Sequence, residues 1–146
     1  MGLDKTDEKI LKNLISDARL SARQLALKMG MSTVTILSRI KKLEKEKIIK
    51  GYTANLDHEM LGYDLTAIIE IVAKKDVTEI ENKLSKMENV VCVYDITGST
   101  DTIAIAKFKG RNELSKFVKA LSSMPNVENT ITRVVLNTVK EDFKLT

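Results

Sequence analysis

The chain of 146 residues has a single cysteine, Cys92, and a single histidine, His58. One cysteine excludes an internal disulfide bond, which suits a reducing compartment. The two residues also cannot form the Cys/His cluster of a zinc site. Cys92 lies in an apolar stretch with no base nearby in the sequence, which favours a small core residue over a nucleophile. We therefore expect no catalytic residue, no metal ion and no cofactor.

Long apolar runs are also missing. No run approaches the ~18 residues that a membrane span requires, and the N-terminal MGLDKTDEK lacks the hydrophobic segment of a signal peptide. We expect a cytoplasmic protein that binds no membrane. With 43% apolar and 30% charged residues, the chain has the composition of one ordinary domain or two small ones.

Charge is distributed unevenly along the chain. Residues 1–54 carry 12 Lys or Arg and 6 Asp or Glu side chains, a net charge of +6. Residues 55–146 carry 12 and 14, a net charge of −2, and the whole chain has +4. A basic first part joined to a mildly acidic second part indicates that a polyanion such as double-stranded DNA binds the first part.

Residues 21–46 predict two short helices joined by a tight turn. Ser21 and Gln24 can form a capping box at the start of the first helix, and Ser32 can cap the second. Ala26 is small where the helices would cross, Gly30 makes the turn, and Ile36 would fill the angle between the helices. This spacing is typical of a DNA-binding helix-turn-helix. A plain helical hairpin explains the spacing about equally well, and the charge of residues 1–54 favours the first alternative.

Polar residues of the second helix, and one lysine after it, are the predicted DNA contacts. Recognition helices contact bases mostly from their first turns, so Thr33, Thr35 and Ser38 are expected to face bases. Arg39 and Lys42 are expected to hold the DNA backbone. The full predicted set is Ser32, Thr33, Thr35, Ser38, Arg39, Lys41, Lys42 and Lys50. Nearby, Val34 and Leu37 would either meet thymine methyl groups or pack internally.

The segments around the motif complete a first domain. A helix capped by Asp4 or Thr6 and ending near Ala18 is needed to enclose a core. Residues 48–53 are rich in strand-forming side chains and predict the strand of a winged helix-turn-helix. We therefore assign residues 1–54 to a DNA-binding domain, 55–63 to a linker and 64–146 to a second domain.

The second domain predicts alternating strands and helices with an internal repeat. Strands are expected over residues 65–73, 90–97, 102–108 and 127–136. Met87-Glu-Asn-Val90 recurs as Met124-Pro-Asn-Val127, an offset of 37 that also maps the apolar face of one intervening helix onto the other. Two βαβ halves in tandem give the ferredoxin-like order βαββαβ, so the fold class of the chain is α+β.

Two of these strands are apolar on both faces. In the second strand, one face would carry Val90 and Cys92 and the other Val91 and Val93. The helices cover only one face of the sheet, and strands that are apolar on both faces are buried on both faces. We therefore expect a homodimer in which two sheets pack face to face.

Four segments of the chain resemble, in order, the Lrp/AsnC (feast/famine) family of transcriptional regulators: LDKTDEKILKNL, ARQLALKMGMS, SRIKKLEKEKIIKGYTA and ITGSTDTIAIAKF. The resemblance covers nearly all of residues 3–140. It implies an N-terminal winged helix-turn-helix, a C-terminal ferredoxin-like ligand domain and dimers that assemble to an octamer. It also implies sequence-specific DNA binding that responds to an amino acid or a related metabolite.

The resemblance further implies an effector pocket at a contact between dimers. The turn from Gly98 to Asp101 matches the Gly-x-x-Asp loop of the family between the second and third strands. There, backbone amides would hold an effector carboxylate, and the aspartate would accept from its ammonium group. Without the resemblance, this turn is first of all a hairpin connection. The implied effector residues are Gly98, Ser99, Thr100, Asp101, Thr130 and Thr132.

Two other functions compete with an effector-responsive regulator. Ferredoxin-like folds host many enzymes, but the sequence offers no nucleophile–base pair, metal cluster or phosphate loop. An architectural DNA-binding protein, whose C-terminal domain only drives assembly, would share every N-terminal feature. Thermal stabilisation by members of an amino-acid panel separates this alternative from an effector-responsive regulator.

Overall fold

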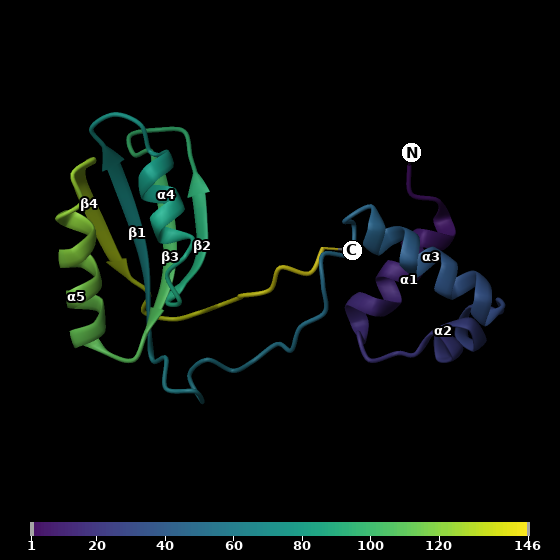
Figure 1. The fold of residues 1–146 in the computed structure, drawn as a ribbon. Coiled ribbons are helices and arrows are strands. Elements are labelled where there is room, and N and C mark those ends of the chain that lie inside the picture. The colour runs from purple at the N-terminus through teal and green to yellow at the C-terminus, as the bar shows by residue number, and fades with distance from the viewer. Residues whose placement is uncertain (1, 146) are drawn as a thin grey trace. The chain divides into compact units, whose positions relative to one another are not determined.

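The computed structural model describes residues 2–145 and divides them into two compact units. The first unit contains the chain up to Asn55 together with the segment from Glu141 onwards, and the second spans Leu56–Lys140. Among the described residues, the first unit contains α-helices alone, and the second contains a sheet together with helices (Figure 1). Within residues 2–145, no helix has the length and apolar character needed to cross a membrane.

The first unit consists of α1 (Lys5–Ser16), α2 (Ala22–Met29) and α3 (Thr33–Lys45). Each helix contributes apolar side chains to one small core. The buried members are Ile10, Leu14, Leu25, Ala26, Ile36 and Leu43. The predicted three-helix core is confirmed, although α1 ends at Ser16, two residues earlier than expected.

The turn between α2 and α3 follows the predicted chemistry. Ser21 and Gln24 form the capping box of α2, and the hydroxyl of Ser32 accepts from the backbone amide of Thr35 at the start of α3. Gly30 has φ 64°, a left-handed conformation that costs side-chain-bearing residues energy. The helix-turn-helix geometry is therefore held by local contacts that the sequence already shows.

The strand expected over residues 48–53 does not form. Between the end of α3 and the start of the sheet at Leu65, the described chain contains no strand. Instead, the amides of Ile48 and Ile49 both donate to the carbonyl of Leu43, at 2.9 and 3.1 Å, and Ile49 packs against the helical core. A strand is held by pairing with a neighbour, and the first unit of the described chain offers none.

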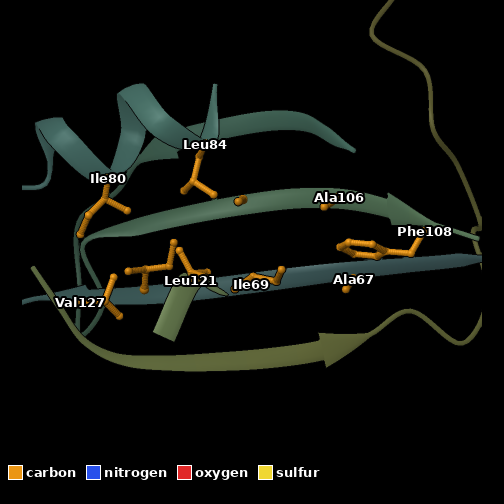
Figure 2. Packing of buried hydrophobic residues seen from close by; sticks show 10 residues of the cluster. Ala67, Ile69, Ile80, Leu84, Ala106, Phe108, Leu121 and Val127 are labelled. Carbon is orange, nitrogen blue, oxygen red and sulfur yellow. The ribbon is translucent and has the colours of Figure 1, made fainter. Parts of the chain in front are cut away.

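The second unit is a four-stranded antiparallel sheet in the order β2-β3-β1-β4. Its elements are β1 (Leu65–Ala73), α4 (Thr78–Leu84), β2 (Val90–Asp95), β3 (Thr102–Phe108), α5 (Arg111–Ser122) and β4 (Val127–Val134). This confirms the predicted βαββαβ order. Ile80 and Leu84 of α4 and Leu121 of α5 belong to one buried cluster with the sheet residues Ile69 and Ala106 (Figure 2). Both helices therefore cover the same face.

The side-chain alternation predicted for β2 is wrong after Val91. A β-bulge shifts the register, so that Val90 pairs with Ala106 and Val93 pairs with Ala104. Both alanines are in the buried core, and both valines pack against it. A bulge adds one residue to one strand and reverses the facing of those that follow. Cys92 therefore lies on the face opposite the helices, and Val93 on the helix face.

Candidate nucleic-acid interface and effector loop

An ion-pair cluster fastens α3 to the start of α1. Asp4 caps α1 by accepting from the amides of Thr6 and Asp7, each at 2.8 Å. One nitrogen of Arg39, Nη1, donates to carboxylate oxygens of Asp4 and Asp7 at 2.7 and 2.8 Å. Nζ of Lys42 lies 3.5 Å from the other oxygen of Asp7. Arg39 is thus directed toward α1 and links the two helices; that it also holds the DNA backbone stays a prediction.

The cluster stays ionised at neutral pH. Burial raises the pKa of Asp7, but hydrogen bonds from Arg39 and from the amide of Asp4 outweigh this, and the pKa lies below its usual value. Hydrogen bonds, first from Arg39 and then from the amide of Asp7, likewise lower the pKa of Asp4. The two carboxylates in turn raise the pKa of Arg39. Charge-assisted hydrogen bonds therefore add to the apolar packing that joins α1 and α3.

The face of α3 opposite the core is exposed, and its centre carries no acid; Glu44, which is also exposed, lies at its margin seven residues after Leu37. Its buried side is formed by Ile36 and Leu43. At about 3.6 residues per turn, positions 34, 38, 41 and 45 share the opposite side of the helix, with position 37 at its margin. The exposed residues of this outward face are Val34, Leu37, Ser38, Lys41 and Lys45.

Not all predicted base contacts belong to this outward face. The hydroxyls of Ser32 and Thr35 lie 2.8 Å apart, and Ser32 also accepts from the amide of Thr35. Thr33 and Thr35 are only half exposed. Ser32 and Thr35 therefore complete the helix cap, because their polar groups bond to each other. Ser38 is the predicted base contact that stands on the outward face.

The prediction left out residues that the structure brings to the site. Lys45 belongs to the outward face, and the helical period counted from Lys41 would have found it. Asp4 and Asp7 position Arg39 from 32 or more residues away in the sequence, and no local pattern indicates that contact. Lys50 is exposed but follows α3 as irregular chain.

The loop between β2 and β3 carries the predicted effector residues. Gly98 has φ 127° and is exposed, as is Ser99, whereas Thr100 is buried. Asp101 is bonded to the end of the central strand β1: its amide donates to the carbonyl of Ile71 at 2.9 Å, and its Oδ2 accepts from the amide of Ala73 at 2.8 Å. One carboxylate oxygen of Asp101 therefore accepts a hydrogen bond that joins the loop to β1.

Thr130 lies at the same end of the sheet as this loop. It pairs with Ile71 from β4, while Asp101 bonds to Ile71 from the other side. Its hydroxyl is 3.2 Å from that of Ser122 in α5, so it faces the helices. Thr132 pairs with Ile69, two residues farther along β4. Asp101 and Thr130 therefore lie on either side of Ile71, and Thr132 lies farther along β4.

The face of the sheet opposite the helices is largely apolar and open within the second unit. Residues that pair directly share a face. The register assigns to this open face the apolar residues Ile68, Val72, Cys92, Tyr94, Ile103, Ile105 and Ile131, and the polar residues Thr66, Glu70, Lys107, Asn129 and Arg133. Nε of Arg133 and Oε1 of Glu70 form an ion pair on this face, at 2.6 Å. No cluster of three or more His, Cys, Asp or Glu side chains suited to a metal ion occurs among residues 2–145.

Models of known protein families match both units. One described as a winged helix-turn-helix DNA-binding domain matches residues 3–50. Another, described as the Lrp/AsnC ligand binding domain, matches residues 66–145, which is more than half of the chain.

Whole-length relatives are also found. An uncharacterized HTH-type transcriptional regulator of Pyrococcus abyssi is 49% identical over 98% of each chain. The HTH-type transcriptional regulator FL11 of Pyrococcus horikoshii is 37% identical, over 98% of this chain and 95% of its own length. The crystal structure of a transcriptional regulator from Neisseria meningitidis in complex with L-Met matches with a TM-score of 0.90 at 31% identity, covering 99% of this chain and 97% of that one.

Proposed function

The chain belongs to the Lrp/AsnC family of transcriptional regulators, and on this basis we propose that it binds specific DNA sequences in response to an amino acid or a related metabolite. It is a transcriptional regulator with a helix-turn-helix DNA-binding domain and an Lrp/AsnC ligand-binding domain. We retain the division into a DNA-binding domain of residues 1–54, a linker of 55–63 and a ligand domain of 64–146.

The observation that carries DNA binding is the outward face of α3. This face exposes Ser38, Lys41 and Lys45, on the helix that enters the major groove in helix-turn-helix proteins. In our proposal the basic side chains hold phosphates and the hydroxyl side chains approach base edges. The basic residues are Arg39, Lys41, Lys42 and Lys50, and the hydroxyl residues are Thr33, Thr35 and Ser38, with Ser32 beside them at the start of the helix. Phosphate contacts release counterions, so affinity should fall steeply with salt.

The proposed effector site is the end of the sheet around Asp101. Its Oδ2 is held by the amide of Ala73, while its other oxygen has acceptor capacity for the ammonium group of an amino acid. Gly98, Ser99 and Thr100 would supply groups to the effector carboxylate, with Thr130 and Thr132 behind them. The bound L-Met of the Neisseria protein supports this ligand class.

We also propose a homodimer formed through the open face of the sheet, with octamers as the higher assembly. Apolar side chains dominate this face, and the exposed Tyr94 and Ile131 belong to it. An apolar sheet face of this kind is normally covered by another layer. The ion pair of Glu70 and Arg133 would then be enclosed with its charges already matched.

One observation favours a second candidate, an architectural DNA-binding protein without an effector. The bond between Asp101 and the amide of Ala73 gives Asp101 a structural reason to be present. In that case the second unit only drives assembly, and no amino acid alters DNA binding.

Selection of bound genomic fragments, with and without each amino acid, tests the proposal. A regulator of this kind enriches a defined sequence, and one amino acid changes the enrichment. Calorimetry on wild type and Asp101→Asn then tests the site, because the change removes the charge with little change in volume. Asp95→Asn, at the end of β2, is the matched control. Heat from no amino acid would favour the architectural candidate, and equal binding by wild type and Asp101→Asn would exclude Asp101 from the site.

A further inference from the structure

Two apolar side chains stand on the outward face of the recognition helix without belonging to any core. Val34 is 77% exposed and Leu37 is 44% exposed. Neither is among the residues that pack with the core of the first unit, whereas Ile36 between them is completely buried. Of the two alternatives that the sequence leaves open, internal packing is therefore excluded for the described unit.

Their neighbours indicate what covers them. Val34 and Leu37 lie in the first two turns of α3, and one turn farther along the same face comes Lys41, followed by Lys45. Lysine binds phosphate as a point charge. Residues of the first turns of a recognition helix approach base edges, and basic residues beyond them reach the backbone. Val34 and Leu37 are thus placed to contact base edges in a DNA groove, and Lys41 and Lys45 to contact the phosphates beside it.

The chemistry of the base edges indicates which base Val34 and Leu37 contact. In the major groove, thymine presents a methyl group beside its acceptor O4, while the other bases present hydrogen-bond donors and acceptors and no methyl group. A valine or leucine side chain can satisfy no donor or acceptor, so covering a polar edge would leave that edge unpaired. We propose that Val34 and Leu37 determine sequence specificity by packing against the 5-methyl groups of thymines. This inference rests on the proposed DNA-binding function.

Replacement of thymine by uracil tests the contact with the methyl group alone. The full-length protein is titrated with the duplex that genomic selection yields, and each thymine is replaced in turn by uracil, which lacks only the methyl group. Wild type should lose about fourfold in affinity for each methyl group it covers, the effect of burying one such group. With Val34→Ala or Leu37→Ala, the thymine-to-uracil ratio should fall to about one at a different position for each variant.

Leu27→Ala is the matched control, because Leu27 is also 77% exposed but belongs to α2; its thymine-to-uracil ratios should equal those of wild type. Val34→Thr keeps the shape of the side chain and replaces one methyl group by a hydroxyl, so it tests the contact with little disturbance of the helix. It should lower the ratio at the Val34 position.

The outcomes distinguish this inference from the function on which it rests. Specific binding that is indifferent to uracil at every thymine overturns methyl recognition and leaves the regulator intact. If genomic selection enriches no sequence, the proposed function itself fails. If Val34→Ala or Leu37→Ala lowers the sedimenting mass while thymine-to-uracil ratios stay unchanged, the two side chains contact another copy of the chain, and methyl recognition is overturned.

Discussion

Asp7→Asn should loosen the helical unit and leave the sheet unit unchanged. Asp7 is completely buried, and its carboxylate accepts from Arg39 and lies near Lys42. Asparagine keeps the volume and one oxygen but removes the charge. Hydrogen bonds to charged groups contribute about 1.5–3 kcal/mol. Because Arg39 keeps its bond to Asp4, we expect the low end of that range, a loss of about 1.5–2 kcal/mol.

Hydrogen exchange measures this loss separately in the two units. Opening of the helical unit should become about 10- to 30-fold more frequent, since each 1.36 kcal/mol is a factor of ten. Backbone amides in α1 and α3 should lose protection by that factor. Amides in β1 and β3 should not change, and they provide an internal reference in the same molecule.

Glu8→Gln is the control, because it removes the same charge from the same turn of α1. Glu8 is exposed, and no ion pair joins it to another of the described residues. Its change should stay below about 1 kcal/mol, the scale of a charge near a helix terminus. Equal loss of protection in the two variants, or none in Asp7→Asn, would refute the argument from the cluster.

The pH dependence of stability follows from the direction of the pKa shifts. The pKa of Asp7 is lower in the folded chain than in the unfolded chain. Its contribution is therefore fully present above the ordinary aspartate pKa of about 3.9, and it is lost as the pH falls through the lower folded value. Thermal unfolding followed by circular dichroism should show a smaller acid destabilisation in Asp7→Asn than in wild type.

Three further predictions concern the turn, the DNA face and the open face of the sheet. Gly30→Ala should cost about 1–2 kcal/mol of stability through its left-handed backbone alone, because an added Cβ meets no atom within 4 Å; an unchanged melting temperature would contradict this. Lys41→Ala should weaken binding to all sequences alike and reduce the salt slope by about one, measured by fluorescence anisotropy, with Lys116→Ala on α5 as control. Ile131→Lys should lower the sedimenting mass by placing a charge in the proposed dimer contact, whereas Asn112→Lys on α5 should not.

Features set by residues close in the sequence are the ones that the sequence predicts well. The capping box of Ser21 and Gln24, the cap at Ser32 and the left-handed Gly30 each depend on neighbours within a few positions. The repeat offset of 37 likewise predicts the βαββαβ order, because both halves bury one helix face on one sheet. Such patterns report periodicity and local conformation directly.

Features that depend on distant partners are the ones that the sequence misses. Residues 48–53 have strand-forming side chains, but no strand of the described first unit is there to pair with them. The bulge after Val90 exchanges the faces of Cys92 and Val93, and a bulge arises from a mismatch between two strands rather than from one. The tie between Asp101 and Ala73 joins a loop to a strand 28 residues away.

Among the basic residues of α3, too, a distant partner decides what the sequence alone does not show. By sequence, Arg39 and Lys41 are equivalent cations two positions apart, and both were predicted to contact DNA. Two positions turn the helix by about 200°, so their side chains leave opposite sides of it. Asp4 and Asp7 meet Arg39 on the side toward α1, which leaves Lys41 and Lys45 at the centre of the outward face and Glu44 at its margin. On α3, the two carboxylates of Asp4 and Asp7 therefore lie against the inner flank of the helix, and the outward face keeps the charges of Lys41 and Lys45.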